Sequence, residues 1–294
     1  MKIASMTSAF RDRRDGGNDI PYTEAVERCK AAGFDILDLN LCSMIKPDRN
    51  EFCGDDWEEK LLDLIAAKEK FQVEFYQTHP PFLSRRYLNE KDEIDNRYII
   101  AMTKRALEIT ARIGAKWAVL HPICGASELC AEKQIELNHQ VYGEVVELAE
   151  KLGIGVAFEN LGQYQDKPWW FGCNASELIA LADSFNSSSV GICWDFGHAN
   201  ISQLNQPEEL RRIGKRLKAV HVTDNRGTTD DHFIPFQGNI RWEEIMPVLV
   251  EIDFPGHLVL EVSLTNHMPN ELKDAGARLS AEADRQLLKL AYGH

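Results

Sequence analysis

The chain has 294 residues, with 33 Lys and Arg against 46 Asp and Glu, and a net charge of −13. Its 44% hydrophobic content is typical of a globular protein that buries a sizeable core. The acidic balance argues against a general nucleic-acid or anionic-membrane partner, because the long-range field of the protein repels polyanions.

Seven cysteines form no CxxC pair, so we expect reduced thiols rather than a disulfide framework or a zinc ribbon. The first ten residues lack the apolar run of a signal peptide, and no stretch is apolar enough to predict a transmembrane helix. These features predict a cytoplasmic protein without membrane contact.

Short apolar runs recur along the chain and are typical of strands that are buried on both faces. In chain order they are residues 2–6, 35–40, 73–78, 116–121, 155–159, 190–194, 219–222 and 257–262. Segments with helical periodicity alternate with these runs, at residues 23–32, 57–71, 95–113, 136–152, 175–183, 208–217, 242–252 and 271–290. Gly33, Gly114 and Gly153 follow three of these segments directly, where they predict left-handed helix caps.

The strand–helix alternation occurs eight times, and eight such units in ~250 residues are the size of a (β/α)₈ barrel. A doubly wound open sheet is the competing fold, but it usually carries a glycine-rich phosphate loop after its first strand. Residues 8–17 lack the GxGxxG spacing of that loop, and we find no linker. The sequence therefore predicts an α/β protein with a single TIM-barrel domain over residues 1–294.

Candidate functional residues gather where the predicted strands end, which is where a TIM barrel carries its active site. Five of the nine histidines fall there, namely His79, His121, His198, His221 and His232. Three carboxylates, those of Glu159, Asp195 and Glu261, emerge from apolar runs that contain no lysine or arginine. Because burying an unpaired charge costs several kcal/mol, a divalent metal is the expected counter-charge.

Taken singly, a strand-end histidine is more often structural and a buried carboxylate more often pairs with an arginine from elsewhere. The argument for a metal is that four candidate ligands come from four consecutive strands: Glu159, Asp195, His221 and Glu261. This oxygen-rich set suits Mn²⁺ or Mg²⁺ and also accepts Zn²⁺ or Co²⁺, so the identity of the metal stays open.

Four motifs carry a family resemblance: FEN at 158–160, CWDFGHAN at 193–200, HVTD at 221–224 and LEV at 260–262. In this order they resemble the sugar-phosphate isomerase/epimerase superfamily with the xylose-isomerase-like barrel. Resemblance to its ketose 3-epimerase branch implies a metal held by Glu159, Asp195, His221 and Glu261. It also implies substrate contacts from His198 and Arg226, and we expect His79 and His121 to line the pocket.

The three-zinc apurinic/apyrimidinic endonucleases are a sister branch that the chain also resembles. Their nine ligand positions are all filled here, and the additional ligands would be His79, His121, His198, Asp230 and His232. Three features argue against a nuclease. The net charge is negative, and residues 41–55 contain no basic cluster that could follow a phosphate backbone. The CWDFGHAN motif also lacks the polar CIDTCHA-like character of those enzymes. Asp230 and His232 remain candidates for a second metal site.

The predicted function is that of a divalent-metal-dependent isomerase or epimerase of a small sugar, sugar phosphate or related polyol. The reaction would remove a proton next to a carbonyl through a metal-stabilised enediolate, with Glu159 and Glu261 as the acid/base pair. The alternatives are a zinc-dependent phosphodiesterase, an inosose dehydratase-type lyase on the same scaffold, and a barrel that only binds a ligand. The expected partner is a small sugar-like substrate, and a homo-oligomer stays open.

Overall fold

Eight parallel strands close into a barrel in chain order, and β8 pairs with β1. The computed structural model of the chain describes residues 1–10, 20–45, 50–83, 93–125, 127, 129–262 and 268–293. The strands are β1 (Ile3–Met6), β2 (Ile36–Asn40), β3 (Glu74–His79), β4 (Trp117–Leu120), β5 (Gly155–Glu159), β6 (Val190–Asp195), β7 (Leu217–Val222) and β8 (Leu258–Leu260). The predicted TIM barrel is confirmed.

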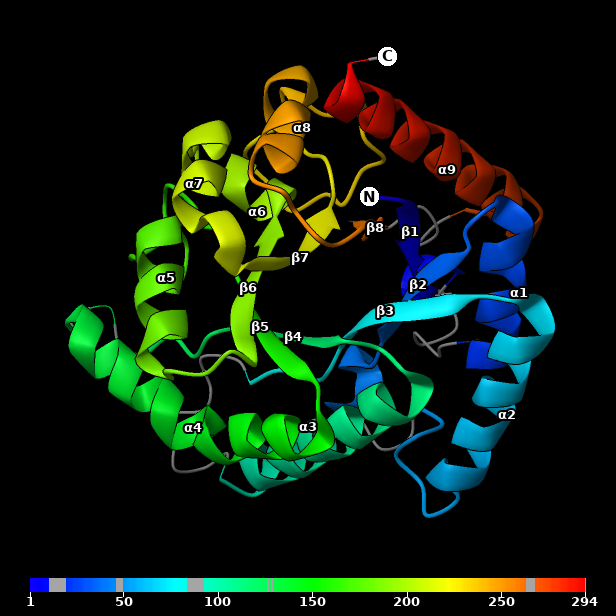
Figure 1. Ribbon diagram of the computed structural model, residues 1–294, viewed down its shortest axis with the longest axis horizontal. Coiled ribbons are helices and arrows are strands. Elements are labelled where there is room, and N and C mark those ends of the chain that lie inside the picture. Colours follow the sequence, from blue (N-terminus) through cyan, green and yellow to red (C-terminus); the bar gives the residue numbers. More distant parts are fainter. Residues whose placement is uncertain are drawn as a thin grey trace.

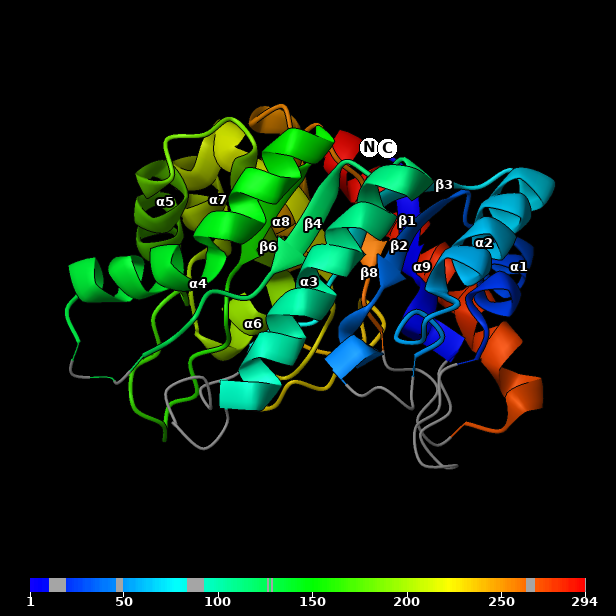
Figure 2. The same ribbon diagram turned by 90° about the horizontal axis from the view of Figure 1, so that it is seen from below.

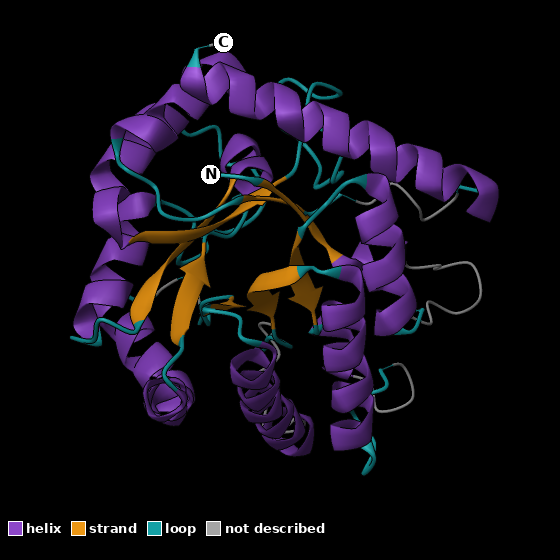
Figure 3. Ribbon diagram, turned by 45° about the vertical axis from the view of Figure 1, so that its right-hand side comes forward, coloured by secondary structure: helices purple, strands orange, loops and turns teal. Residues whose placement is uncertain are grey.

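Helices surround the strands, as Figure 3 shows, and they follow one another around the ring in chain order (Figure 1). The α-helices are α1 (Tyr22–Ala32), α2 (Trp57–Phe71), α3 (Glu93–Ile113), α4 (Ala131–Leu152), α5 (Ala175–Ser184), α6 (Phe196–Ile201), α7 (Gln206–Ile213), α8 (Trp242–Glu251) and α9 (Asn270–Tyr292). Short 3₁₀ turns lie at η1 (Thr7–Phe10), η2 (Cys42–Ile45) and η5 (Gly214–Arg216). Gly33, Gly114 and Gly153 have φ values of 102°, 81° and 71°, so the predicted left-handed caps are confirmed.

The structure corrects the sequence-based elements at several places, and helix α4 begins at Ala131 instead of residue 136. The helix predicted over 208–217 ends at Ile213, because Gly214 adopts a φ of 54° that stops it, and Leu217 already belongs to β7. The strand predicted over 257–262 is shorter in the structure, where β8 spans Leu258–Leu260. Helix α6 was not predicted, and it starts directly after β6 because the Asp195 side chain accepts a hydrogen bond from the His198 amide at 2.6 Å.

Both termini lie on the same side of the molecule, as Figure 2 shows, and the Met1 amino group donates to the Tyr292 hydroxyl at 2.9 Å. Helix α9 thereby returns to the strand with which the barrel starts. None of the helices in the described part of the chain combines the length and the apolar character that crossing a membrane would require.

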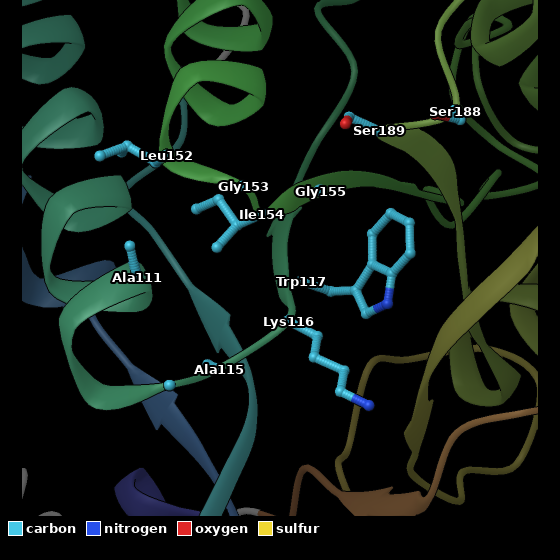
Figure 4. Close-up of a pocket in the computed structure, with 11 residues that line it drawn as sticks. Ala111, Ala115, Lys116, Trp117, Leu152, Gly153, Ile154, Gly155, Ser188 and Ser189 are labelled. Atoms are coloured by element: carbon cyan, nitrogen blue, oxygen red, sulfur yellow. The ribbon is translucent and has the colours of Figure 1, made fainter.

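The interior of the barrel is filled with side chains, and Trp117 packs against two apolar clusters there, one around Tyr76 and one around Cys193. A pocket of about 550 Å³ opens beside Trp117 and Lys116, at the starts of β4 and β5 (Figure 4). In a parallel barrel these strand starts lie at the opposite end from the strand ends that carry the predicted site. This pocket is therefore separate from that site.

The close approach of α6 to the end of β7 yields a first prediction. A Cβ on Gly197 would lie 2.0 Å from the hydroxyl oxygen of buried Thr223 and 2.9 Å from the Asn225 amide nitrogen. We expect Gly197→Ala to lower the free energy of unfolding by about 1–3 kcal/mol, the usual cost of overpacking, in chemical denaturation. Gly143→Ala in α4, where a Cβ meets nothing within 4 Å, is the control and should raise stability by up to about 1 kcal/mol. Equal stability of both variants would contradict the packing argument.

Candidate metal centre

Three carboxylates and one imidazole meet at the C-terminal mouth of the barrel. Glu159 and Asp195 are the last residues of β5 and β6, His221 lies in β7, and Glu261 follows β8 directly. The strand register places Asp195 beside His221. Each of the four side chains offers one ligand atom such that all four atoms lie within 4.8 Å of one another. We call this group the mouth cluster.

His221 is the centre of the mouth cluster. Its Nδ1 lies 2.8 Å from Glu159 Oε1 and 3.3 Å from Glu261 Oε2. Glu159, Asp195 and His221 are fully buried, whereas the Glu261 side chain keeps 19% of its surface exposed. The cluster is therefore open to solvent on the side of Glu261.

The second oxygen of Glu159 faces two further histidines. His79 Nε2 lies 3.3 Å from Glu159 Oε2, and His121 Nε2 lies 3.1 Å from it. Both are ion-pair distances without hydrogen-bond geometry, so this buried oxygen has no hydrogen-bond partner among the described residues. On its other side, the His79 Nδ1 contacts the Cys42 thiol at 3.2 Å.

The donor atoms of the mouth cluster fit a divalent cation. The buried Asp195 Oδ2 and Glu159 Oε2 lack hydrogen-bond partners among the described residues, although leaving such atoms unsatisfied is costly. Three carboxylates with one imidazole form an oxygen-rich set that suits Mn²⁺ or Mg²⁺ and is accepted by Zn²⁺ or Co²⁺. The geometry leaves the choice among these ions open.

Burial and charge set the protonation of the mouth cluster. Burial by itself lowers the pKa of His221, but the carboxylates of Glu159 and Glu261 outweigh it and hold this pKa well above its usual value. Burial raises the pKa of Asp195 to about 6. For Glu159, burial acts to raise the pKa, but the imidazoles of His221 and His121 hold it well below its usual value.

The two histidines beside Glu159 Oε2 have pKa values that are shifted in different directions. Burial lowers the pKa of His121. Burial also acts to lower the pKa of His79, but Cys42 and Glu159 outweigh it and raise that pKa well above its usual value. The pKa values of these two imidazoles are therefore shifted in opposite directions.

Asp230, His232 and His198 form a second group beside the mouth cluster. Asp230 Oδ2 lies 3.0 Å from His232 Nε2 and 3.5 Å from His198 Nε2. His198 Nδ1 donates to the Asn160 carbonyl at 2.8 Å. These residues are near neighbours, but among the described residues they do not belong to a group with the compactness of the mouth cluster.

Arg226 is the predicted sugar-binding arginine. It is exposed, and its guanidinium carbon lies 5.7 Å from the centre of the Phe233 ring. Around the mouth cluster the structure brings together five further predicted site residues, namely His79, His121, His198, Asp230 and His232.

Sequence reasoning missed Asp38, Asn160 and Cys42. Asp38 is fully buried in β2 and lies 3.5 Å from His221 Nε2, and its carboxylate inside the apolar run ILDLN was a usable signal. Asn160 donates to the Asp195 carbonyl at 2.9 Å and accepts from the Asp195 amide at 2.6 Å. No sequence pattern pointed to the contact between Cys42 and His79, because these residues lie on different strand ends.

The profile of the family described as "Xylose isomerase-like TIM barrel" matches residues 26–283, which is most of the chain. The chain belongs to the xylose isomerase-like TIM barrel family. Its relatives include the inosose isomerase of Bacillus velezensis, 25% identical over 247 residues, which are 78% of this chain and 79% of that protein. The D-psicose 3-epimerase of Enterocloster bolteae is 28% identical over 253 residues, 82% of this chain and 76% of that protein.

A crystal structure of the IOLI protein with a bound zinc atom has the same fold, with a TM-score of 0.73 and 19% identity. That likeness covers 100% of this chain and 99% of the other. Together with the relatives named as an isomerase and an epimerase, the family membership makes this chain an enzyme of the xylose isomerase-like TIM barrel family.

Metal binding should compete with protons at the mouth cluster, because His221 must lose a proton and Asp195 must be ionised before either binds a cation. With the pKa of Asp195 near 6 and that of His221 well above its usual value, the affinity for Mn²⁺ should rise with pH and fall steeply below about pH 6. Calorimetry in two buffers of different ionisation enthalpy should show proton release. An affinity that does not depend on pH would place the ion elsewhere.

Proposed function

We propose that the chain is a divalent-metal-dependent isomerase or epimerase acting on a small sugar, sugar phosphate or related polyol. The observation that carries the proposal is the mouth cluster, in which two glutamates share a buried histidine at the open end of the barrel. The D-psicose 3-epimerase and inosose isomerase among the relatives support this class of reaction.

Glu159, Asp195, His221 and Glu261 would hold the metal, and the IOLI structure with its zinc atom supports a metal at this type of barrel. When bound, a divalent metal supplies Lewis-acid polarisation of a substrate carbonyl, which makes the proton on the neighbouring carbon easier to remove. Mn²⁺, Mg²⁺, Zn²⁺ and Co²⁺ are the candidates.

Glu159 and Glu261 would move the proton. Glu159 Oε1 faces the mouth cluster, 2.8 Å from His221 Nδ1, whereas Oε2 has no hydrogen-bond partner among the described residues. This second oxygen can accept a proton from the substrate carbon, which neutralises the carboxylate. His79 Nε2 and His121 Nε2 lie beside it, at 3.3 and 3.1 Å. Glu261 occupies the more open side of the cluster, where it can exchange a proton with substrate or solvent.

His198 would contact a substrate oxygen. Its Nδ1 proton is committed to the Asn160 carbonyl, so Nε2 is the nitrogen that faces Asp230 and the mouth of the barrel. His79 and His121 would line the pocket close to Glu159. Arg226 is exposed and would meet only the outer end of a substrate.

The proposal is tested by a screen of ketoses, ketose phosphates and inososes in deuterated water, with each of the four metals added in turn. Deuterium incorporation at carbon reports proton abstraction whatever the product is. Loss of water from the product would instead indicate a lyase on the same scaffold. No incorporation into any of these compounds would contradict the proposed substrate class.

Replacing Glu159 or Glu261 with glutamine should abolish most of the activity while the side chain keeps its length and shape. General acid–base catalysis is typically worth ~10²–10⁴-fold, so we expect kcat to fall by at least that factor. The comparison requires kcat at a metal occupancy measured for each sample. Asp195→Asn is the contrasting variant, since it should lose activity in proportion to its bound metal and regain part of it at high Mn²⁺. Near-normal rates for both glutamine variants at full occupancy would exclude them as proton carriers.

A zinc-dependent phosphodiesterase is the second candidate function. It is favoured by His79 and His121 at Glu159 Oε2 and by His198 and His232 at Asp230 Oδ2, which are positions where additional ions could replace protons. The −13 net charge and the named relatives favour the sugar enzyme.

Asp230→Asn and His232→Ala distinguish the two functions. For an isomerase, both variants should retain deuterium exchange within about tenfold, because neither residue belongs to the proposed acid/base pair. For a phosphodiesterase, the protein should carry three tightly bound zinc ions, and either substitution should abolish cleavage of a duplex with an abasic site. Metal content by plasma mass spectrometry and cleavage assays of the unmodified protein are the measurements. Catalytic cleavage would overturn the isomerase proposal.

A further inference from the structure

Asp38 is a buried carboxylate that the proposed reaction does not use. It lies in the middle of β2 with no exposed surface, and its Oδ2 lies 3.5 Å from His221 Nε2. Burying a carboxylate is costly unless charged or polar neighbours compensate it. The contact with His221 gives Asp38 a role.

The two ring nitrogens of His221 face different surroundings. Nδ1 points into the mouth cluster, towards Glu159 Oε1 and Glu261 Oε2. Nε2 is buried and has no hydrogen-bond partner among the described residues. It lies within ion-pair distance of the Asp38 carboxylate. A neutral imidazole carries one proton, and only the nitrogen without it can bind a metal. Which nitrogen keeps the proton therefore decides whether His221 can serve as a ligand through Nδ1.

Gln77 fixes the orientation of Asp38. Its side-chain amide donates to Asp38 Oδ2 at 2.9 Å, and both residues are fully buried. The same oxygen that faces His221 Nε2 is thus held in place from the neighbouring strand β3. A carboxylate held in this way favours a proton on the nitrogen that faces it.

We propose that Asp38 is a positioning residue that keeps the proton of His221 on Nε2, so that Nδ1 remains available as a metal ligand. Gln77 supports this role through Asp38. The inference rests on the metal site of the proposed function. It adds to that site a carboxylate that faces Nε2 of the ligand histidine. Partners of this kind typically change metal affinity by roughly 10- to 100-fold.

The first test compares the Kd for Zn²⁺, measured by competition with a chelator, in the unmodified protein, Asp38→Asn and Asp284→Asn. Asp284 is the matched control, since it is also a fully buried aspartate with one partnerless oxygen among the described residues, and it contacts the Ala4 amide instead of a histidine. We expect Asp38→Asn to weaken Zn²⁺ binding roughly 10- to 100-fold and Asp284→Asn to leave it unchanged. Equal affinities for Asp38→Asn and the unmodified protein, or equal losses in both variants, would overturn the inference.

The second test needs no variant at Asp38 and so covers the case in which Asp38→Asn fails to fold. Long-range ¹H–¹⁵N correlation spectra of the Zn²⁺-loaded protein report which ring nitrogen of each histidine carries the proton, and His221→Gln identifies the signals of His221. We expect a protonated Nε2 and a metal-bound Nδ1. A protonated Nδ1 would overturn the role of Asp38. If the unmodified protein binds no divalent metal at all, the proposed function itself fails, and that outcome is distinct from a failure of the Asp38 inference.

Discussion

The buried carboxylate of Glu159 is the constraint around which the mouth of the barrel is built. A charged group at this depth costs several kcal/mol unless cations or hydrogen bonds compensate it. His79, His121, His198 and His221 all place a nitrogen within 4 Å of its oxygens, and they come from different strand ends. Protonated imidazoles can balance the carboxylates in the metal-free protein, and they can release protons when a cation takes over that task.

Asp195 and Asn160 show how backbone geometry aims the side chains of the site. Asp195 caps α6 with Oδ1, and its Oδ2 has no hydrogen-bond partner among the described residues. Asn160 holds the Asp195 backbone through two hydrogen bonds. The Asn160 carbonyl also accepts from His198. Asn160, directly after β5, therefore positions both the last residue of β6 and His198 in α6. The geometry of metal ligands depends on such supporting contacts.

The loop after β7 is organised by Asp224 instead of by regular secondary structure. The buried Asp224 carboxylate accepts from the amides of Asn225 and Phe236 at 2.9 Å and from the Trp242 indole at 3.2 Å. This anchoring holds the segment that carries Asp230 and His232, and His232 itself adopts a φ of 50° while its ring contacts the Glu261 carbonyl at 2.8 Å. The loop and the end of β8 are thus tied together beside the mouth cluster.

The sequence by itself determined the alternation of strands and helices, because the periodicity of apolar residues and the glycine caps are local signals. It also determined which strand ends carry charged residues. It singled out Glu159, Asp195 and Glu261, since a carboxylate in an apolar run stands out without any knowledge of its neighbours, and it marked His221 as a histidine at a strand end. Only the tertiary structure decided the pairings: Cys42 with His79, Asp38 with Nε2 of His221, and Arg226 with the Phe233 ring. These contacts join residues far apart in the chain, and their distances follow from the register and closure of the barrel, which no local pattern encodes.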